Sequence, residues 1–231
     1  ADIEAMRRNL VSHAGHLVAL ERDSGRHITL ALEPEPCCFL ETIAEAVDFF
    51  GQELFGAASV AELAAHARIS RAAAAAALRE HLGLCLDLCH AAVEYESAAE
   101  GLRQLDAAGI RVHKMQVSAG LRLPALDAEA LAALRRFDDA VYLHQVVERS
   151  AAGLRRFTDL PEALAAGHAS VPDEWRVHFH VPIFLEGLPV LSVSPVPLPH
   201  SWRLIKRGLD LLVAIPALVL TLPLLGYCAV R

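Results

Sequence analysis

Short apolar segments alternate with helical segments along most of the chain, and this alternation constrains the fold more than any other sequence feature. Helical patterns such as 41–55 and 91–108 separate the apolar segments. Strands that alternate with helices are typical of βαβ units, in which neighbouring strands run parallel. The sequence therefore predicts an α/β fold with a parallel sheet. The predicted strands are 27–32, 82–86, 110–117, 140–146 and 176–181.

The charge balance excludes a general nucleic-acid binder. The chain has 231 residues, with 21 Lys and Arg against 28 Asp and Glu, for a formal charge of −7. Nucleic-acid binders of that kind show a basic face. The segment 60–82 mimics a helix-turn-helix, but its second helix is largely alanine and offers few groups to base edges. We therefore expect no nucleic-acid partner.

The cysteines indicate a reducing compartment. There are five, which is an odd number, and Cys37 and Cys38 are neighbours. Cys85 and Cys89 are spaced like no common zinc module. The first residues are polar and acidic, so they do not predict a secretory signal. We expect a cytoplasmic protein without a cysteine zinc site.

The C-terminal part contains a run of twenty uncharged residues, 211–230, which is long enough to span a membrane. Basic residues at 203, 206 and 207 precede it and predict that the rest of the chain faces the cytoplasm. Because prolines occur at 216 and 223, a re-entrant hairpin is an alternative to a straight membrane span. A buried core helix is a further alternative.

This pattern predicts three regions. Residues 1–190 form the α/β domain, 191–202 are a proline-rich linker, and 203–231 are a membrane helix that attaches the chain to the inner membrane.

Polar side chains follow each predicted strand at its carboxyl end, where parallel α/β folds gather functional groups. Glutamates 33 and 35 alone would fit a charged turn, and Asp87 a helix N-cap. Together, however, carboxylates and imidazoles at successive strand ends favour a divalent ion such as Mn, Fe, Co or Zn. The strand-end residues are Glu33, Glu35, Asp87, His90, His113, Lys114, Gln116, His144, Gln145, His178 and His180.

Five segments in order carry a resemblance to a known family. They are 33–38, 84–90, 114–118, 142–145 and 178–182, and together they resemble the EboE family of metabolite traffic proteins. That family looks like a branch of the xylose isomerase-like TIM barrels. The resemblance covers about residues 1–190.

The resemblance implies a metal-binding (β/α) barrel related to sugar isomerases and epimerases. A sugar-like or polyol metabolite would be the ligand, and the metal would fix two of its oxygens while a carboxylate moves a proton. By position in the family's pattern, the implied metal ligands are Glu33, Asp87, His90, Gln116 and His180, with His178 beside them. The implied catalytic residues are Glu33, Glu35 and Lys114.

Two departures from the family pattern leave other functions open. A complete barrel has eight strands and five are predicted, so we expect a partial barrel. The family's late Glu-x-Glu-Thr strand is also missing after His180. Residues 202–224 instead resemble the start of the membrane phosphoglycosyl transferases, with Pro223 as the helix break. A membrane-docked binding protein without turnover and a fragment of such a sugar transferase are therefore the alternatives.

Overall fold

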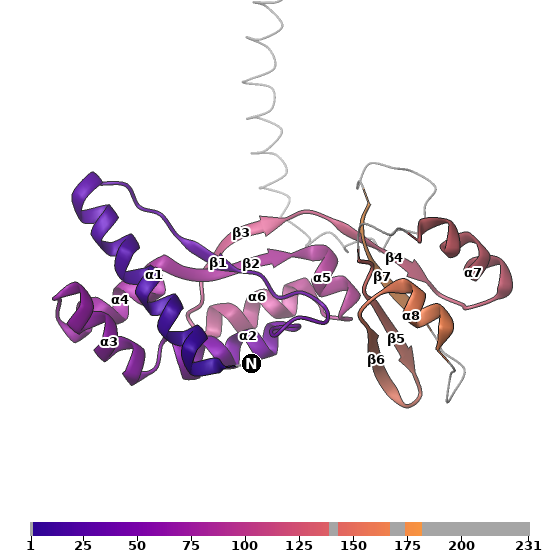
Figure 1. Cartoon of the computed structure of the whole chain (residues 1–231), viewed down its shortest axis with the longest axis horizontal. Helices are drawn as coiled ribbons and strands as arrows, with labels where there is room; N and C mark the ends of the chain where they lie inside the picture. Colours follow the sequence, from indigo (N-terminus) through magenta and orange to yellow (C-terminus); the bar gives the residue numbers. More distant parts are fainter. Residues whose placement is uncertain (1, 139–142, 167–173, 182–231) are drawn as a thin grey trace, which may run out of the picture. The chain divides into compact units, whose positions relative to one another are not determined.

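The structure is a computed structural model that describes residues 2–138, 143–166 and 174–181 (Figure 1). The chain divides near residue 193, and all described residues belong to the first unit.

The first half of this unit is a three-stranded parallel sheet with helices, as the alternating pattern predicts. The strand order is β1-β2-β3, and Leu30 and Leu32 of β1 pair with Leu82 and Leu84 of β2. The elements are α1 (Ile3–Ser24), β1 (Leu30–Leu32), α2 (Ile43–Phe49), a π-helical turn η1 (Phe50–Leu54), α3 (Ala57–Ala67), α4 (Arg71–His81), β2 (Leu82–Asp87), α5 (Leu88–Val93), α6 (Ala98–Ala107) and β3 (Val112–Gln116).

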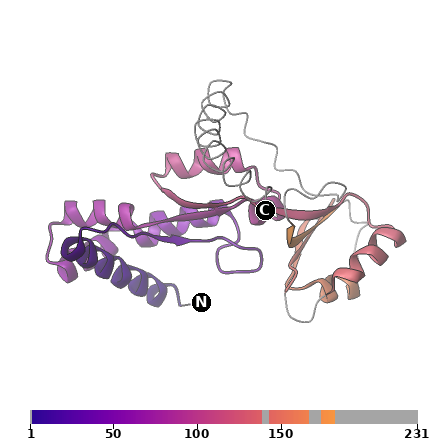
Figure 2. The same cartoon turned by 90° about the horizontal axis from the view of Figure 1, so that it is seen from above.

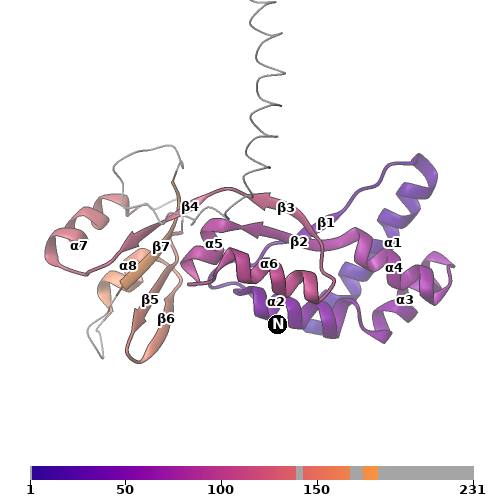
Figure 3. The ribbon, with the colours of Figure 1, turned by 180° about the vertical axis from the view of Figure 1, so that it is seen from behind.

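The side chains of strand β2 show that one face of the sheet is apolar and the other is polar. Side chains alternate along a strand, and Leu82, Leu84 and Leu86 all point into a buried core shared with the helices. Figures 1 and 3 show helices α2, α3, α4 and α6 below the strands. Cys85 and Asp87 alternate with these leucines and so belong to the other face, which therefore carries the polar groups of the site.

One predicted helix is two helices in the structure. The segment 91–108 contains the end of α5 and all of α6, and the break between them falls at Tyr95, whose φ of 62° is left-handed. Ser97 then caps α6 by accepting a hydrogen bond from the Glu100 amide. The sequence has no glycine at this break, and for that reason the hydrophobic pattern predicts a single continuous helix.

The second half forms an antiparallel sheet, so the prediction that all five strands share one parallel sheet is wrong. The order is β4-β7-β5-β6, and β7 pairs antiparallel with both β4 and β5. The elements are β4 (Ala119–Leu123), α7 (Ala128–Leu134), a 3₁₀ turn η2 (Arg135–Phe137), β5 (Val146–Ser150), β6 (Gly153–Phe157), α8 (Leu160–Ala165) and β7 (Glu174–Val181).

The antiparallel sheet arises because β5 and β6 form a local hairpin. Ser150 pairs with Gly153 across a two-residue turn, and Gly153 adopts a φ of 111° that suits glycine. A hairpin needs no crossover helix, unlike a parallel pair. The predicted strand 140–146 corresponds only at its end to β5, and residues 139–142 lie outside the described residues.

Strands β3 and β4 join the two sheets. Only Val117 and Ser118 separate them in sequence, and Figure 2 shows them running one after the other. Helix α5 packs against β4 and β7 of the second sheet. In the part of the chain that is described, the strands form two open sheets and no closed barrel.

No helix among the described residues has the length and apolarity that a membrane span requires. The predicted linker at 191–202 and membrane helix at 203–231 lie outside those residues.

Candidate metal centre

The site lies where the carboxyl ends of β1, β2 and β3 meet strand β7. Glu33 and Glu35 follow β1, Asp87 ends β2, Gln116 ends β3, and His178 comes from β7. Parallel neighbours bring the first four to one edge of the sheet because their strands end there together.

Asp87 is fixed as an ionised acceptor. It caps helix α5, so that its Oδ1 accepts hydrogen bonds from the amides of Cys89 (2.7 Å) and His90 (3.2 Å). The hydroxyl of Ser118 donates to the same oxygen at 2.6 Å. Burial alone would raise the pKa of Asp87, but the hydrogen bonds from the Ser118 hydroxyl and from the amides of His90 and Cys89 hold that pKa below its usual range. A carboxylate therefore stands at the start of α5.

Gln116 holds two carboxylates together. Its Nε2 donates to Oε1 of Glu33 and to Oδ2 of Asp87, both at 2.5 Å. Its Oε1 accepts from Nζ of Lys114 at 2.8 Å. The amide nitrogen thus lies where two acidic groups converge. Gln116 could act as a metal ligand only after its side-chain amide flips, because Oε1 would be the ligand atom and Nε2 now faces the two carboxylates.

The most informative contact joins the two histidines. Nε2 of His90 lies 3.1 Å from Nε2 of His178. Nδ1 of His90 faces the carbonyl oxygen of Pro34 at 3.0 Å, and a carbonyl only accepts, so this nitrogen carries the hydrogen. In a neutral His90 ring, Nε2 then presents a lone pair to His178.

His178, like His90, carries its ring hydrogen on Nδ1. Its Nδ1 lies 2.6 Å from Oε1 of Gln145, whose Nε2 in turn donates to Oε1 of Glu35 at 2.9 Å. The carboxylate fixes the amide orientation, since only the NH₂ end can face it, and so Nδ1 of His178 is the donor. Two neutral rings in these tautomers would direct their Nε2 lone pairs at each other. A metal ion bound by both nitrogens, or a proton shared between them, removes that repulsion.

This arrangement matches how histidines bind metals. A ligating imidazole usually donates its other N–H to a carbonyl or a carboxylate-like acceptor. Both rings do so here, and both residues are almost fully buried, at 4% exposure for His90 and 8% for His178. Glu35 completes a group of three possible ligands whose atoms all lie within 4.8 Å of one another.

The structure places the possible ligands in two groups that share His90. One is Glu35, His90 and His178, and the other is Glu33, Asp87 and His90. Glu35 was expected from the sequence as a catalytic residue, whereas the other four were expected as ligands. Glu33 lies on the Nδ1 side of the ring, 3.5 Å from that nitrogen. The side chain of Glu33 is 31% exposed, so the second group opens toward solvent.

The other expected residues are placed as follows. Lys114 reaches the site through the hydrogen bond that it donates to Gln116. His180 belongs to β7, but its side chain lies outside the described part of the structure. Gln145 and Ser118 were not in the expected ligand and catalytic set, although Gln145 lies near the end of a predicted strand and Ser118 directly follows another.

Burial affects both cysteines near the site. It raises the pKa of Cys85 to about 11 and that of Cys89 to about 12. Both thiols are therefore protonated at neutral pH when no metal is bound, and ligation by either would release a proton.

Comparisons with known proteins give no relative for this chain. No family model matches it, and neither the curated proteins nor the solved structures contain a match.

Proposed function

We propose that this chain is a divalent-metal-binding module that acts on a sugar-like or polyol metabolite, with isomerisation or epimerisation as the reaction class. The observation that carries the proposal is the facing pair of Nε2 atoms of His90 and His178, each ring held from behind by an acceptor.

The ligand set defines the class of metal. Two imidazole nitrogens and one carboxylate suit Mn, Fe, Co or Zn better than Mg or Ca. Such a set leaves coordination positions open, and hydroxyl or carbonyl oxygens of a polyol would fill them.

The second group of residues would handle the proton. Glu33 is partly exposed, and it lies beside Asp87 through the shared amide of Gln116. An accessible carboxylate next to a metal-held substrate is suited to general acid–base work. Lys114 lies at the exposed rim and would contact the polar substrate.

The parallel half of the unit supports a partial barrel of the xylose isomerase-like type. Strands β1, β2 and β3 are adjacent and parallel, and their polar residues gather at the carboxyl ends, as in the EboE-like pattern. The antiparallel sheet departs from that barrel plan, and it contributes His178 and Gln145 to the site.

Metal analysis of the purified full chain tests the ligand assignment. We expect His90→Ala and His178→Ala each to lose one equivalent of bound metal. His16→Ala, an exposed histidine on α1, is the matched control and should lose none. An unchanged metal content in both site variants would contradict the proposal.

A turnover assay separates an enzyme from a binding protein. The metal-loaded chain is given a panel of sugars, polyols and sugar phosphates. We expect conversion that is lost in Glu33→Gln while its metal content is kept. Bound polyol without any conversion would favour the membrane-docked binding protein. The sugar transferase alternative rests on residues 202–224, which are not among the described residues.

A further inference from the structure

A second cluster of metal-binding residues lies at the opposite end of the parallel sheet. Glu21 is in the last turn of α1, His27 is in the loop before β1, and His81 ends α4 directly before β2. These residues precede the strands, whereas the centre described above follows them. One ligand atom from each of the three lies within 4.8 Å of the others.

The hydrogen bonds of His81 define its tautomer. Its side chain is buried, and its Nδ1 lies 2.7 Å from the carbonyl oxygen of Ile28. Because the carbonyl can only accept, Nδ1 carries the hydrogen. In a neutral ring, Nε2 is then an acceptor.

That Nε2 nevertheless faces a carboxylate oxygen. It lies 3.2 Å from Oε2 of Glu21, and Nδ1 of His27 lies 3.0 Å from the same oxygen. A glutamate carboxyl is ionised at neutral pH, so Oε2 of Glu21 is an acceptor only. Two acceptors at 3.2 Å require a positive charge between them or on the ring.

The distances fit a shared zinc ion. Zinc bonds of 2.0–2.2 Å to nitrogen and oxygen at a tetrahedral angle place neighbouring ligand atoms about 3.3 Å apart. The two nitrogen-to-oxygen distances are 3.0 and 3.2 Å, and the His27 and His81 rings lie side by side with centroids 4.7 Å apart.

We propose that Glu21, His27 and His81 form a second zinc site, with three protein ligands and one position for water or an anionic ligand. Nδ1 of His27, Nε2 of His81 and a carboxylate oxygen of Glu21 are the ligand atoms. Two histidines with one glutamate is a set that zinc uses where one position stays open.

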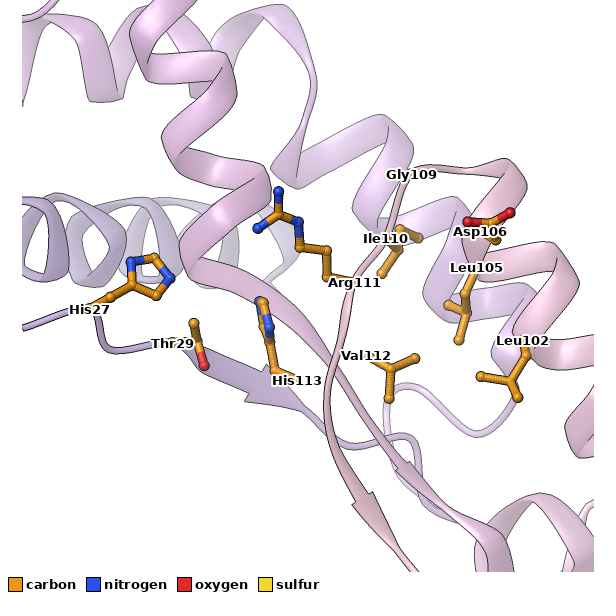
Figure 4. A pocket seen from close by; sticks show the side chains of 10 residues that line it. All are labelled: His27, Thr29, Leu102, Leu105, Asp106, Gly109, Ile110, Arg111, Val112 and His113. Atoms are coloured by element: carbon orange, nitrogen blue, oxygen red, sulfur yellow. The ribbon is translucent and has the colours of Figure 1, made fainter. Parts of the chain in front are cut away.

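The neighbouring surface gives a small ligand access to this site. His27 also lines an open hollow of about 760 Å³ together with Thr29 and His113. Figure 4 shows these three side chains together at one end of the hollow, with Leu102 and Leu105 at the other. A ligand in the hollow would therefore reach the ring of His27.

Zinc titration of the metal-free full chain tests the proposal. The probe is Zn²⁺ at pH 7.5, with bound equivalents measured by competition against a chromogenic chelator. We expect His27→Ala and Glu21→Gln each to bind one equivalent fewer than the unchanged chain. Both side chains are 41% exposed, so these variants should keep the fold, which circular dichroism verifies.

Two further variants make the outcome specific. His16→Ala, on the exposed surface of the same helix, should keep every equivalent. His27→Ala combined with His90→Ala should lose two equivalents, so failure of one site is distinguishable from failure of the other. Equal zinc binding by the unchanged chain, His27→Ala and Glu21→Gln would overturn the second site and indicate that His81 carries a proton instead.

Discussion

Nε2 of His90 lies 3.1 Å from Nε2 of His178, although the two residues are 88 positions apart in sequence. His90 comes from the helix that follows the parallel strand β2, and His178 comes from the antiparallel strand β7. The candidate centre therefore depends on both sheets.

Metal binding should stabilise the fold through this pair. A ligand at one hundred times its Kd adds about 2.7 kcal/mol to the free energy of unfolding. We expect Mn²⁺ or Zn²⁺ to raise the Tm of the unchanged chain. The same ion should have a smaller effect on His178→Ala, measured by thermal unfolding with and without chelator. An equal rise in both proteins would contradict the assignment.

Arg156→Ala should be one of the more costly surface changes. Arg156 pairs with Glu94, whose side chain is fully buried, and also lies 3.2 Å from Glu41. Removing one partner of a buried pair leaves an uncompensated charge and costs about 3 kcal/mol. Arg103→Ala breaks only an exposed pair and should cost less than about 1 kcal/mol. Urea unfolding measures both, and equal costs would contradict the prediction.

The carboxyl of Glu96 should make stability fall between about pH 4.5 and pH 7. Burial raises its pKa to about 7, so the folded chain holds this proton more tightly than the unfolded chain does. The resulting stabilisation is complete below pH 4.5 and is lost as the pH rises through 7.

The Ile43 amide donates a hydrogen bond to Oε1 of Glu96 at 2.9 Å, and Glu96→Gln keeps a side-chain oxygen that can still accept it. Partial exposure reduces the effect. The free energy of unfolding of the unchanged chain should therefore fall by about 1–2 kcal/mol across this pH range, and Glu96→Gln should abolish that fall. Urea unfolding at a series of pH values measures it. Glu129→Gln, at an exposed position, is the control, and an unchanged slope in Glu96→Gln would disprove the assignment.

Gly83→Ala should destabilise the parallel sheet. A Cβ at this position would lie 2.5 Å from the carbonyl oxygen of Arg111 and would also collide with the ring of His113. The backbone of the neighbouring strand must then shift, at a cost of about 1–3 kcal/mol. Gly51→Ala has open space around its Cβ and serves as the control. Similar stability of the two variants would show that the strand yields easily.

The sequence predicted the parallel half of the fold because its signals are local. Leu82, Leu84 and Leu86 form an apolar strand between two helices, and Asp87 lies at the helix start where its carboxylate caps the amides. The residues Glu33, Asp87, His90 and Gln116 follow from the rule that parallel strands end at one edge, and the structure brings them together.

The antiparallel half was not predictable in the same way. Its hairpin strand β6 carries two adjacent arginines, Arg155 and Arg156, which hide the apolar alternation expected of a strand. The pairing of β7 with β4 and β5 depends on contacts distant in sequence. For that reason the role of Gln145 in orienting both His178 and Glu35 appears only in the structure.

The contacts of the centre span long stretches of chain, since Glu35 and Gln145 are 110 positions apart. Closing loops of this length is entropically costly and slows folding, so these contacts should be among the last to form. An ion held by His90 and His178 would then act as a removable cross-link. Its withdrawal would let β7 separate from α5 before the local core around Leu84 opens, and amide exchange would detect that order.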